Sequence, residues 1–152
     1  MPGLSEKVAA ELEQIERALG ELPAARRIKK LSVLELGGTG SLLSAVYHGA
    51  ENILKQCLIA LGATLPTGAA WHRDLLQSAG DHGIISGEMR DLLAPYMAFR
   101  HVFTHAYGFE LDPERLQPLV RDVPTVYARF KKEVKRFARA QARRQSSSGS
   151  RS

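Results

Sequence analysis

Arg100, His101, His105 and Tyr107 lie within one stretch of eight residues, which concentrates the side chains that could do chemistry. A guanidinium stays charged at neutral pH, and imidazoles titrate close to it. Cleavage of an RNA phosphodiester without a metal needs a base for the 2′-hydroxyl proton, an acid for the leaving oxygen and a cation for the crowded phosphorane. The stretch therefore fits acid–base chemistry on a phosphodiester, with Arg100 at the phosphate and His105 as base or acid.

The spacing of Arg100 and His105 limits how one chain could bring them together. Positions five apart on an ideal helix point about 140° away from each other, because the helix repeats every 3.6 residues. The two side chains converge only if the helix ends between them or if a second copy of the chain contributes. Gly108 favours a helix end close by. In a dimer, two copies of His105 could divide the acid and base roles.

Two other motifs suggest ligands but lack the residues that would complete them. His101 and His105 are four apart, the spacing at which one helix face offers two imidazoles to zinc, but no Cys or Glu stands beside them in a recognised ligand pattern. The run from Gly37 to Ser41 is rich in glycine like a phosphate-binding loop, yet no Gly-Lys-Ser/Thr follows it and no strand precedes it. We therefore expect no metal ion and no other cofactor.

Apolar residues recur at spacings of three and four along the chain, which predicts an all-α, up-and-down bundle of four to five main helices. The first helix is expected over residues 4–22, with Ser5 as its cap and Pro23 as its stop. The second is expected over about residues 31–61. A break within it is favoured at Gly37 to Gly40, since each glycine costs roughly 1 kcal/mol in a helix interior, although close approach of a neighbouring helix could offset that cost.

The later helices are expected to carry the motif and the basic residues. A short helix should begin near Trp71 and end near Gly80. Ser86 can cap the helix that leads into the motif, and Pro95 predicts a kink or a boundary within it. Two further helix starts are predicted where an aspartate stands close before a proline: Asp112-Pro113 and Asp122-Val123-Pro124.

Length and composition fit one globular domain over residues 1–144. Of 152 residues, 44% are hydrophobic and 24% charged, as in ordinary soluble proteins. The one cysteine, Cys57, cannot form an intrachain disulfide and suits a reducing compartment. The chain starts without a signal-peptide pattern, and no apolar run approaches the ~20 residues that a membrane span requires. We expect a cytoplasmic protein that does not enter membranes.

The positive charge is concentrated near the C-terminus. Residues 1–120 hold 11 Lys and Arg against 14 Asp and Glu, whereas residues 121–152 hold 10 against 2. A basic helix of this kind could attract an RNA backbone, and it would equally suit an acidic protein partner. The residues predicted to contact RNA are Arg129, Lys132, Lys135, Arg136 and Arg139. The serine-rich residues 145–152 are expected to be disordered.

The string from Phe99 to Tyr107 reads Phe-Arg-His-Val-Phe-Thr-His-Ala-Tyr and contains the pattern R-x4-H-x-Y. This pattern resembles the signature of the HEPN superfamily, specifically the HepT-like toxins of prokaryotic toxin–antitoxin pairs. The resemblance extends to residues 47–54, 65–76 and 108–116, which are similar to three other segments of that family. Together these segments cover about residues 31–137, so the resemblance does not depend on the motif alone.

The resemblance implies a helical bundle that forms a homodimer with its two motifs facing each other. It also implies a metal-independent ribonuclease, cutting RNA internally or from an end, with Arg100 and His105 as the catalytic pair. In such type VII-like systems the antitoxin is an MNT-type nucleotidyltransferase that adenylylates the motif tyrosine, a role that would fall on Tyr107. The added bulk and negative charge would silence the enzyme.

Several assignments remain open at this stage. His101 stands where the family often has asparagine, and it could support catalysis or lie on the surface. Glu51 could line the site or form a surface pair, and the resemblance favours a supporting role. Trp71 and His72 could stack on RNA, although an aromatic beside apolar neighbours usually belongs to a core. The alternative functions are a non-catalytic HEPN adaptor that binds a nucleotidyltransferase, and a basic RNA-binding helical module.

Overall fold

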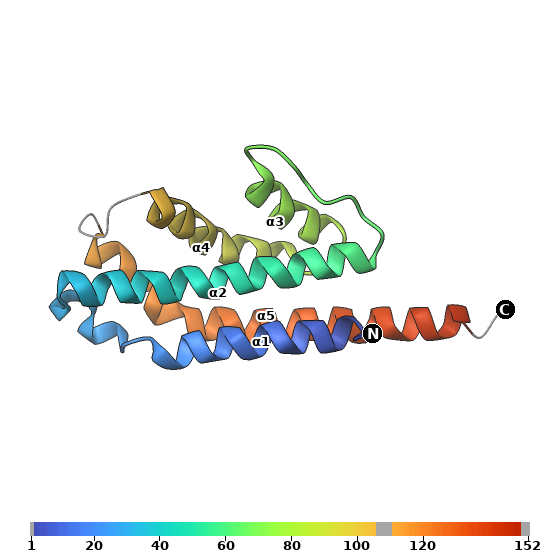
Figure 1. The fold of residues 1–152 in the computed structure, drawn as a ribbon, viewed down its shortest axis with the longest axis horizontal. Coiled ribbons are helices and arrows are strands. Elements are labelled where there is room, and N and C mark those ends of the chain that lie inside the picture. Colours follow the sequence, from blue (N-terminus) through green and yellow to red (C-terminus); the bar gives the residue numbers. More distant parts are fainter. Residues whose placement is uncertain (1, 106–110, 150–152) are drawn as a thin grey trace.

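The fold is a bundle of five α-helices and one short 3-10 helix (Figure 1). The structure is a computed structural model that describes residues 2–105 and 111–149, and within these ranges it contains no strand. The elements in chain order are α1 (Leu4–Glu21), η1 (Ala25–Lys30), α2 (Val33–Ala60), α3 (Trp71–Asp81), α4 (Gly87–His105) and α5 (Pro113–Gly149). The prediction of an all-α bundle is confirmed.

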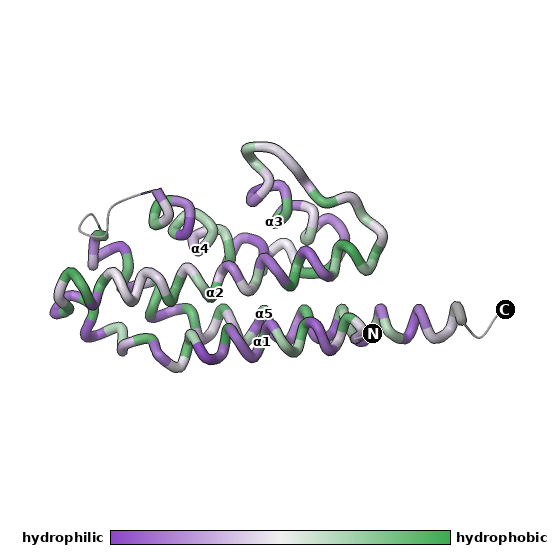
Figure 2. The backbone as a smooth tube through the Cα atoms, viewed as in Figure 1, coloured by the Kyte–Doolittle hydropathy of each residue, from purple (hydrophilic) through white to green (hydrophobic). Residues whose placement is uncertain are grey.

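Helix α2 is the centre of the bundle and contacts every other α-helix. In Figure 1, α3 and α4 lie on one side of it and α1 and α5 on the other. Its buried positions include Leu43, Tyr47, Leu54 and Leu58, and hydrophobic residues recur along its whole length (Figure 2). A helix that is apolar on more than one face must be covered on more than one side, which explains its central place. Within the described residues, no helix is long and apolar enough to cross a membrane.

Helix α2 runs without a break through Gly37 to Gly40, so the break that local propensity favours does not occur and the alternative of a continuous helix holds. Ser32 caps the helix start, because its hydroxyl accepts from the amide of Glu35 while the Glu35 carboxylate accepts from the amide of Ser32. At Gly40, a Cβ atom would lie 2.8 Å from the ring of Phe103 in α4. The close approach of a neighbouring helix therefore accounts for one of the three glycines and helps to offset their cost.

Two prolines that could have marked helix boundaries lie inside helices instead. Pro95 lies within α4, and Pro124 lies within α5 rather than starting a new helix. Both helices bury an apolar face across the proline, and the hydroxyl of Tyr96 donates to the main-chain carbonyl of Leu119 at 2.8 Å. Burial of these faces outweighs the lost backbone hydrogen bond. Ser86 does cap α4, since its hydroxyl accepts from the amide of Met89.

Three further differences concern helix ends. The cap of α1 is Gly3 rather than Ser5, because the Glu6 carboxylate reaches back to the Gly3 amide. The 3-10 helix η1 follows Pro23 and was not predicted. Helix α5 continues to Gly149, past residue 145, where the serine-rich tail was expected to begin. This last part of α5 projects past the other helices (Figure 1).

Candidate functional site

Arg100 lies on the inward face of α4, which explains how a charged residue reaches the interior. The buried residues Met89, Leu93 and Tyr96 follow a spacing of four and three, and the next steps along the same face are Arg100 and Phe103. The residues beside them, at 101, 102, 104 and 105, are exposed. Helical periodicity therefore turns the arginine toward α2 and leaves both histidines of the motif on the outer side of α4.

The same pattern brings a carboxylate and an imidazole to the interior from two other helices. On α2, Glu51 follows Tyr47 by four residues and precedes Leu54 by three, so it shares their buried face. On α3, His72 precedes the buried Leu76 and Ala79 at the same spacings. Because α2 packs against both α3 and α4, the three polar groups meet where these helices contact.

Glu51 bridges Arg100 and His72. Its Oε1 accepts from Nη1 of Arg100 at 3.0 Å, and its Oε2 lies 2.6 Å from Nδ1 of His72. The Glu51 side chain is 1% exposed, whereas Arg100 is 24% exposed and His72 35% exposed. An isolated carboxylate at this depth would cost several kcal/mol, and two donors from different helices offset that cost. The prediction that Glu51 belongs to the site and not to the surface fits this arrangement.

A pocket of about 400 Å³ opens beside the bridge. Residues of α2, of the segment that enters α3 and of the C-terminal half of α4 form its walls, and they include His72, Arg100, His101 and His105. Arg100 and His105 thus face one cavity within a single chain, although they are five positions apart. Its lining residues on α4 run from Met97 to His105, the last described residue of that helix.

The two motif histidines lie against each other, with tilted rings, and both line this pocket. Their ring centroids are 4.6 Å apart, and Nδ1 of His105 lies 2.7 Å from the main-chain carbonyl of His101. A carbonyl oxygen only accepts, so Nδ1 of His105 carries the proton in this bond and Nε2 is the nitrogen left for other groups. No group of three or more His, Cys, Asp or Glu that could hold a metal occurs among the residues whose placement is described.

Tyr47 closes the inner side of the pocket. Its side chain is almost fully buried, and its hydroxyl finds no hydrogen-bond partner among the described side chains and backbone. Burial, together with the nearby charge of Glu51, raises the pKa of this phenol well above its ordinary value, so Tyr47 stays neutral. Tyr107, the predicted target of adenylylation, lies outside the described residues.

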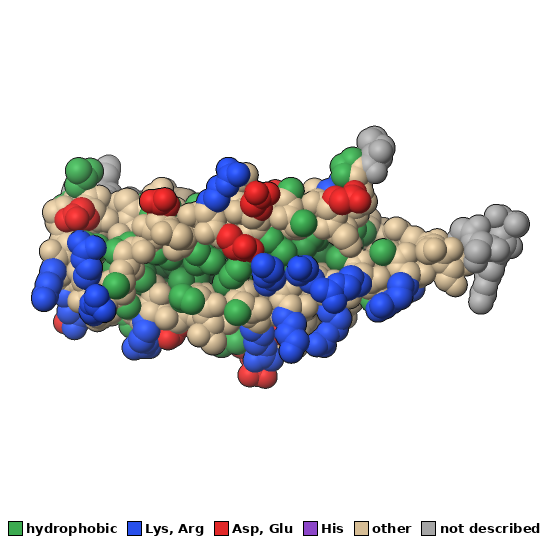
Figure 3. Space-filling view, turned by 90° about the horizontal axis from the view of Figure 1, so that it is seen from below, with side chains coloured by type: hydrophobic (Ala, Val, Ile, Leu, Met, Phe, Trp, Pro, Cys, Tyr) green, Lys and Arg blue, Asp and Glu red, His purple; other side chains and the backbone are tan. Residues whose placement is uncertain are grey.

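The basic residues of α5 lie away from this pocket, and none of them lines it. Basic side chains gather toward the C-terminal end of the face formed by α1 and α5 (Figure 3). Arg129 is held in ion pairs with Glu88 and Glu133. The other four predicted RNA-contacting residues have no ion pair with any described residue. They are Lys132, Lys135, Arg136 and Arg139.

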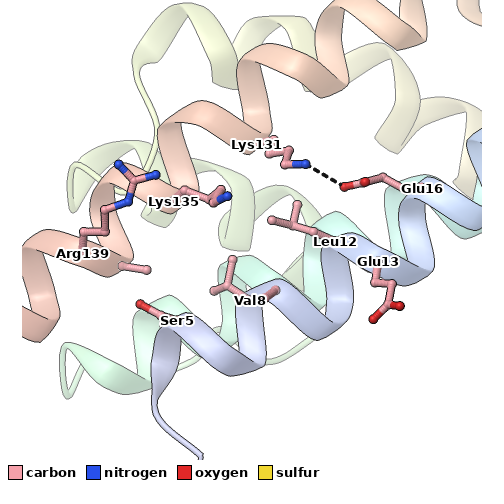
Figure 4. A pocket seen from close by; sticks show the side chains of 10 residues that line it. Ser5, Val8, Leu12, Glu13, Glu16, Lys131, Lys135 and Arg139 are labelled. Atoms are coloured by element: carbon pink, nitrogen blue, oxygen red, sulfur yellow. Dashed lines mark hydrogen bonds and ion pairs between the residues drawn. The ribbon is translucent and has the colours of Figure 1, made fainter.

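Lys135 and Arg139 line a second groove, which lies between α1 and α5 and also measures about 400 Å³ (Figure 4). Val8 and Leu12 of α1 lie opposite them, and Lys131 forms an ion pair with Glu16 across the groove at 3.0 Å. This groove is basic along α5 and apolar at its base, and it has no residue in common with the motif pocket.

Sequence reasoning placed Arg100, His105, His101 and Glu51 at one site, and the structure brings these four residues together. It missed the part played by His72, which the sequence analysis weighed only as a stacking or core residue. The signal was present, because His72 lies on the same helical face as Leu76 and Ala79 and so had to point inward. Trp71 is partly buried against the core, and the centroid of its ring lies 3.6 Å from the centroid of the His72 imidazole.

The fold and the site define an all-α bundle in which an Arg-x4-His motif on one helix meets a buried glutamate on another, and this is the arrangement expected of a HEPN-superfamily protein. The family model described as HepT-like protein matches residues 38–141, about two thirds of the chain. The chain belongs to this HepT-like family. No curated protein is similar enough to the chain to count as a relative.

Proposed function

We propose that the protein is a metal-independent ribonuclease toxin in which Arg100 and His105 form the catalytic pair. The observation that carries this proposal is their shared pocket, in which Arg100 is anchored by Glu51 while its Nε and Nη2 have no partner among the described residues. A guanidinium held by one nitrogen keeps the others for a phosphate, and its planar fork suits two non-bridging oxygens. Membership of the HepT-like family supports the ribonuclease class.

The reaction follows from these groups and the chemistry of RNA. The 2′-oxygen loses its proton to a base and attacks phosphorus, the P–O5′ bond breaks, and an acid gives the leaving oxygen a proton. The products are a 2′,3′-cyclic phosphate and a 5′-hydroxyl end. Arg100 stabilises the negative charge that grows on the phosphorane, and His105 exchanges a proton through Nε2.

Regulation in this proposal acts on Tyr107, two residues beyond His105. A partner nucleotidyltransferase of the MNT type would transfer adenylate to its hydroxyl and block the path of RNA. A homodimer would place two such sites together, and His101, whose ring lies beside that of His105, would support the catalytic imidazole. Coexpression with such a partner should add the mass of one adenylate to the wild-type chain and none to Tyr107→Phe, and a label on another residue would contradict this assignment.

The direct test is cleavage of a labelled RNA oligonucleotide in the presence of EDTA. Wild-type protein should cleave, and His105→Ala should lose about 10²- to 10⁴-fold in rate, the range that a general acid or base contributes. His48→Ala is the matched control, because His48 is exposed on α2 and lies outside the pocket. Equal rates for wild type and His105→Ala would remove the basis of the proposal.

The groove between α1 and α5 favours a second candidate, a HEPN adaptor that binds a nucleotidyltransferase without cleaving RNA. Lys135 and Arg139 stand above apolar side chains there, a combination that suits an acidic amphipathic segment of a protein better than a bare phosphate backbone. An adaptor predicts no cleavage by wild type, and it predicts partner binding that His105→Ala preserves and a Lys135→Glu, Arg139→Glu double variant weakens.

A further inference from the structure

We propose that His72 is the second acid–base group of the site, acting as the base that accepts the 2′-hydroxyl proton while His105 acts as the acid. This proposal rests on the proposed ribonuclease function and adds a catalytic residue that lies outside the R-x4-H-x-Y motif. It also assigns Glu51 as the positioning residue for both His72 and Arg100.

The geometry around His72 fixes which of its nitrogens is available. A carboxylate oxygen accepts, so the 2.6 Å contact with Glu51 places the proton on Nδ1 of His72 and leaves the lone pair on Nε2. Glu51 comes from within the core, whereas the imidazole remains 35% exposed and lines the pocket. The ring of Trp71 packs beside the imidazole and is itself covered by Nζ of Lys55 at 4.2 Å. The imidazole is therefore held in one orientation at the wall of the cavity.

The partners of the two imidazoles distinguish their roles. When Nε2 of His72 takes a proton, the resulting imidazolium lies against the buried carboxylate of Glu51. The aspartate of a Ser-His-Asp triad stabilises its histidine in the same way. Nδ1 of His105 faces only neutral groups, the main-chain carbonyl of His101 at 2.7 Å and the hydroxyl of Thr104 at 3.1 Å, so no carboxylate stands behind this imidazole. His72 thus suits the step that removes the 2′-hydroxyl proton. His105 suits the step that protonates O5′ as the P–O5′ bond breaks.

One consequence is that a single chain holds a complete set of catalytic groups. His72, Arg100 and His105 come from α3 and α4 of the same protomer and face one pocket. A dimer would then not be needed to supply a second imidazole, in contrast to a site that combines two copies of His105. The two arrangements make different predictions for mixtures of inactive variants.

The test compares His72→Asn with His105→Ala on two RNA substrates. The amide nitrogen of asparagine lies near the position of Nδ1, so His72→Asn keeps a donor for Glu51 and removes the nitrogen that exchanges the proton. One substrate is an ordinary oligonucleotide, and the other has sulfur in place of the 5′-bridging oxygen at the cleaved linkage. A thiolate leaves without being protonated, so the second substrate bypasses the acid but still needs the base.

We expect His72→Asn to lose about 10²-fold or more on both substrates, in the range of a general base, while His105→Ala loses activity on the oxygen substrate and recovers most of it on the sulfur substrate. Each variant is compared with wild type by thermal unfolding. If His72→Asn is unfolded, His72→Gln takes its place in the same assay. A mixture of the two inactive variants should regain no activity.

The outcomes separate the two proposals. Wild-type rates for a folded His72→Asn would overturn the role of His72 and leave the Arg100 and His105 nuclease standing. Sulfur rescue of His72→Asn in place of His105→Ala would reverse the assigned roles and so overturn them. Activity regained on mixing would show that the acid and base come from different chains. No cleavage by wild type would refute the ribonuclease function, and the role of His72 with it.

Discussion

Arg100 and Glu51, 49 residues apart in the chain, are joined by a 3.0 Å hydrogen bond from Nη1 to Oε1. The arginine of the motif is therefore fixed by the central helix α2 before any substrate binds. A guanidinium that is already oriented loses less conformational entropy when it contacts a phosphate. The buried carboxylate is thus as much a part of the candidate site as the motif itself.

Replacing Glu51 should weaken both folding and cleavage. Glu51→Gln keeps the shape of the side chain, but it removes the charge and turns an amide donor toward Arg100 or His72. We expect a loss of about 1–3 kcal/mol in the free energy of unfolding. This is less than the cost of breaking an ion pair that is fully buried, because Arg100 and His72 are both partly exposed. Urea denaturation measures the stability, and RNA cleavage should fall by at least about 10-fold.

The control for this variant is Glu13→Gln. Glu13 pairs with Arg17 at 3.8 Å on the surface of α1, where both side chains are 70% exposed. Its replacement should change the free energy of unfolding by less than about 0.5 kcal/mol and leave cleavage unaltered. If the two variants behaved alike, the bridge at Glu51 would have no special role.

Arg100→Lys should separate charge from geometry. Lysine keeps the positive charge and can still reach Glu51, but it cannot hold the carboxylate and two phosphate oxygens at once. We expect stability within about 1 kcal/mol of wild type and a loss of about 10²-fold in the cleavage rate, as for removal of one preorganised donor. Arg17→Lys serves as the surface control. A fully active Arg100→Lys would mean that charge alone suffices.

Two glycines of α2 should respond oppositely to alanine. A Cβ atom at Gly49 would lie 2.5 Å from Cγ1 of Ile15, inside the packed contact of α1 with α2, so Gly49→Ala should lose about 1–3 kcal/mol. Gly38 has no atom within 4 Å of such a Cβ, and Gly38→Ala should gain about 0.5–1 kcal/mol from helix propensity. Thermal unfolding measures both. A stabilising Gly49→Ala would contradict the tight packing of these helices.

Cys57 should make folding sensitive to alkali. Burial raises the pKa of its thiol to about 12, above the value of about 8.5 expected in the unfolded chain. Between these values the native state binds the proton more tightly, so this contribution to stability is present below pH about 8.5 and is lost as pH rises toward 12. Cys57→Ala should reduce the pH dependence of the unfolding free energy in this window, measured at several pH values.

The same burial should protect the thiol in the native protein. A thiol reagent at pH 8 should modify Cys57 slowly in buffer and rapidly in denaturant, because the reactive thiolate requires both exposure and ionisation. Rapid labelling of folded protein would mean that α2 opens readily around this position.

Much of the fold could be predicted from the sequence, because helical periodicity is a local property. The apolar spacing of three and four predicted the number of helices, and the cap at Ser86 and the stop at Pro23 were correct. The helices continue through Gly37 to Gly40, Pro95 and Pro124 for one reason. Local propensity favours a break at each place, and burial of an apolar face against other helices outweighs it.

The candidate site divides in the same way. The sequence by itself determined the motif residues Arg100 and His105, since their types and spacing lie within one segment. Only the tertiary structure decided that Glu51 joins Arg100 to His72, because these residues come from three helices and no local pattern relates them. Each lies on the inward face of its own helix, and the packing of α3 and α4 on α2 turns three separate periodicities into one buried bridge.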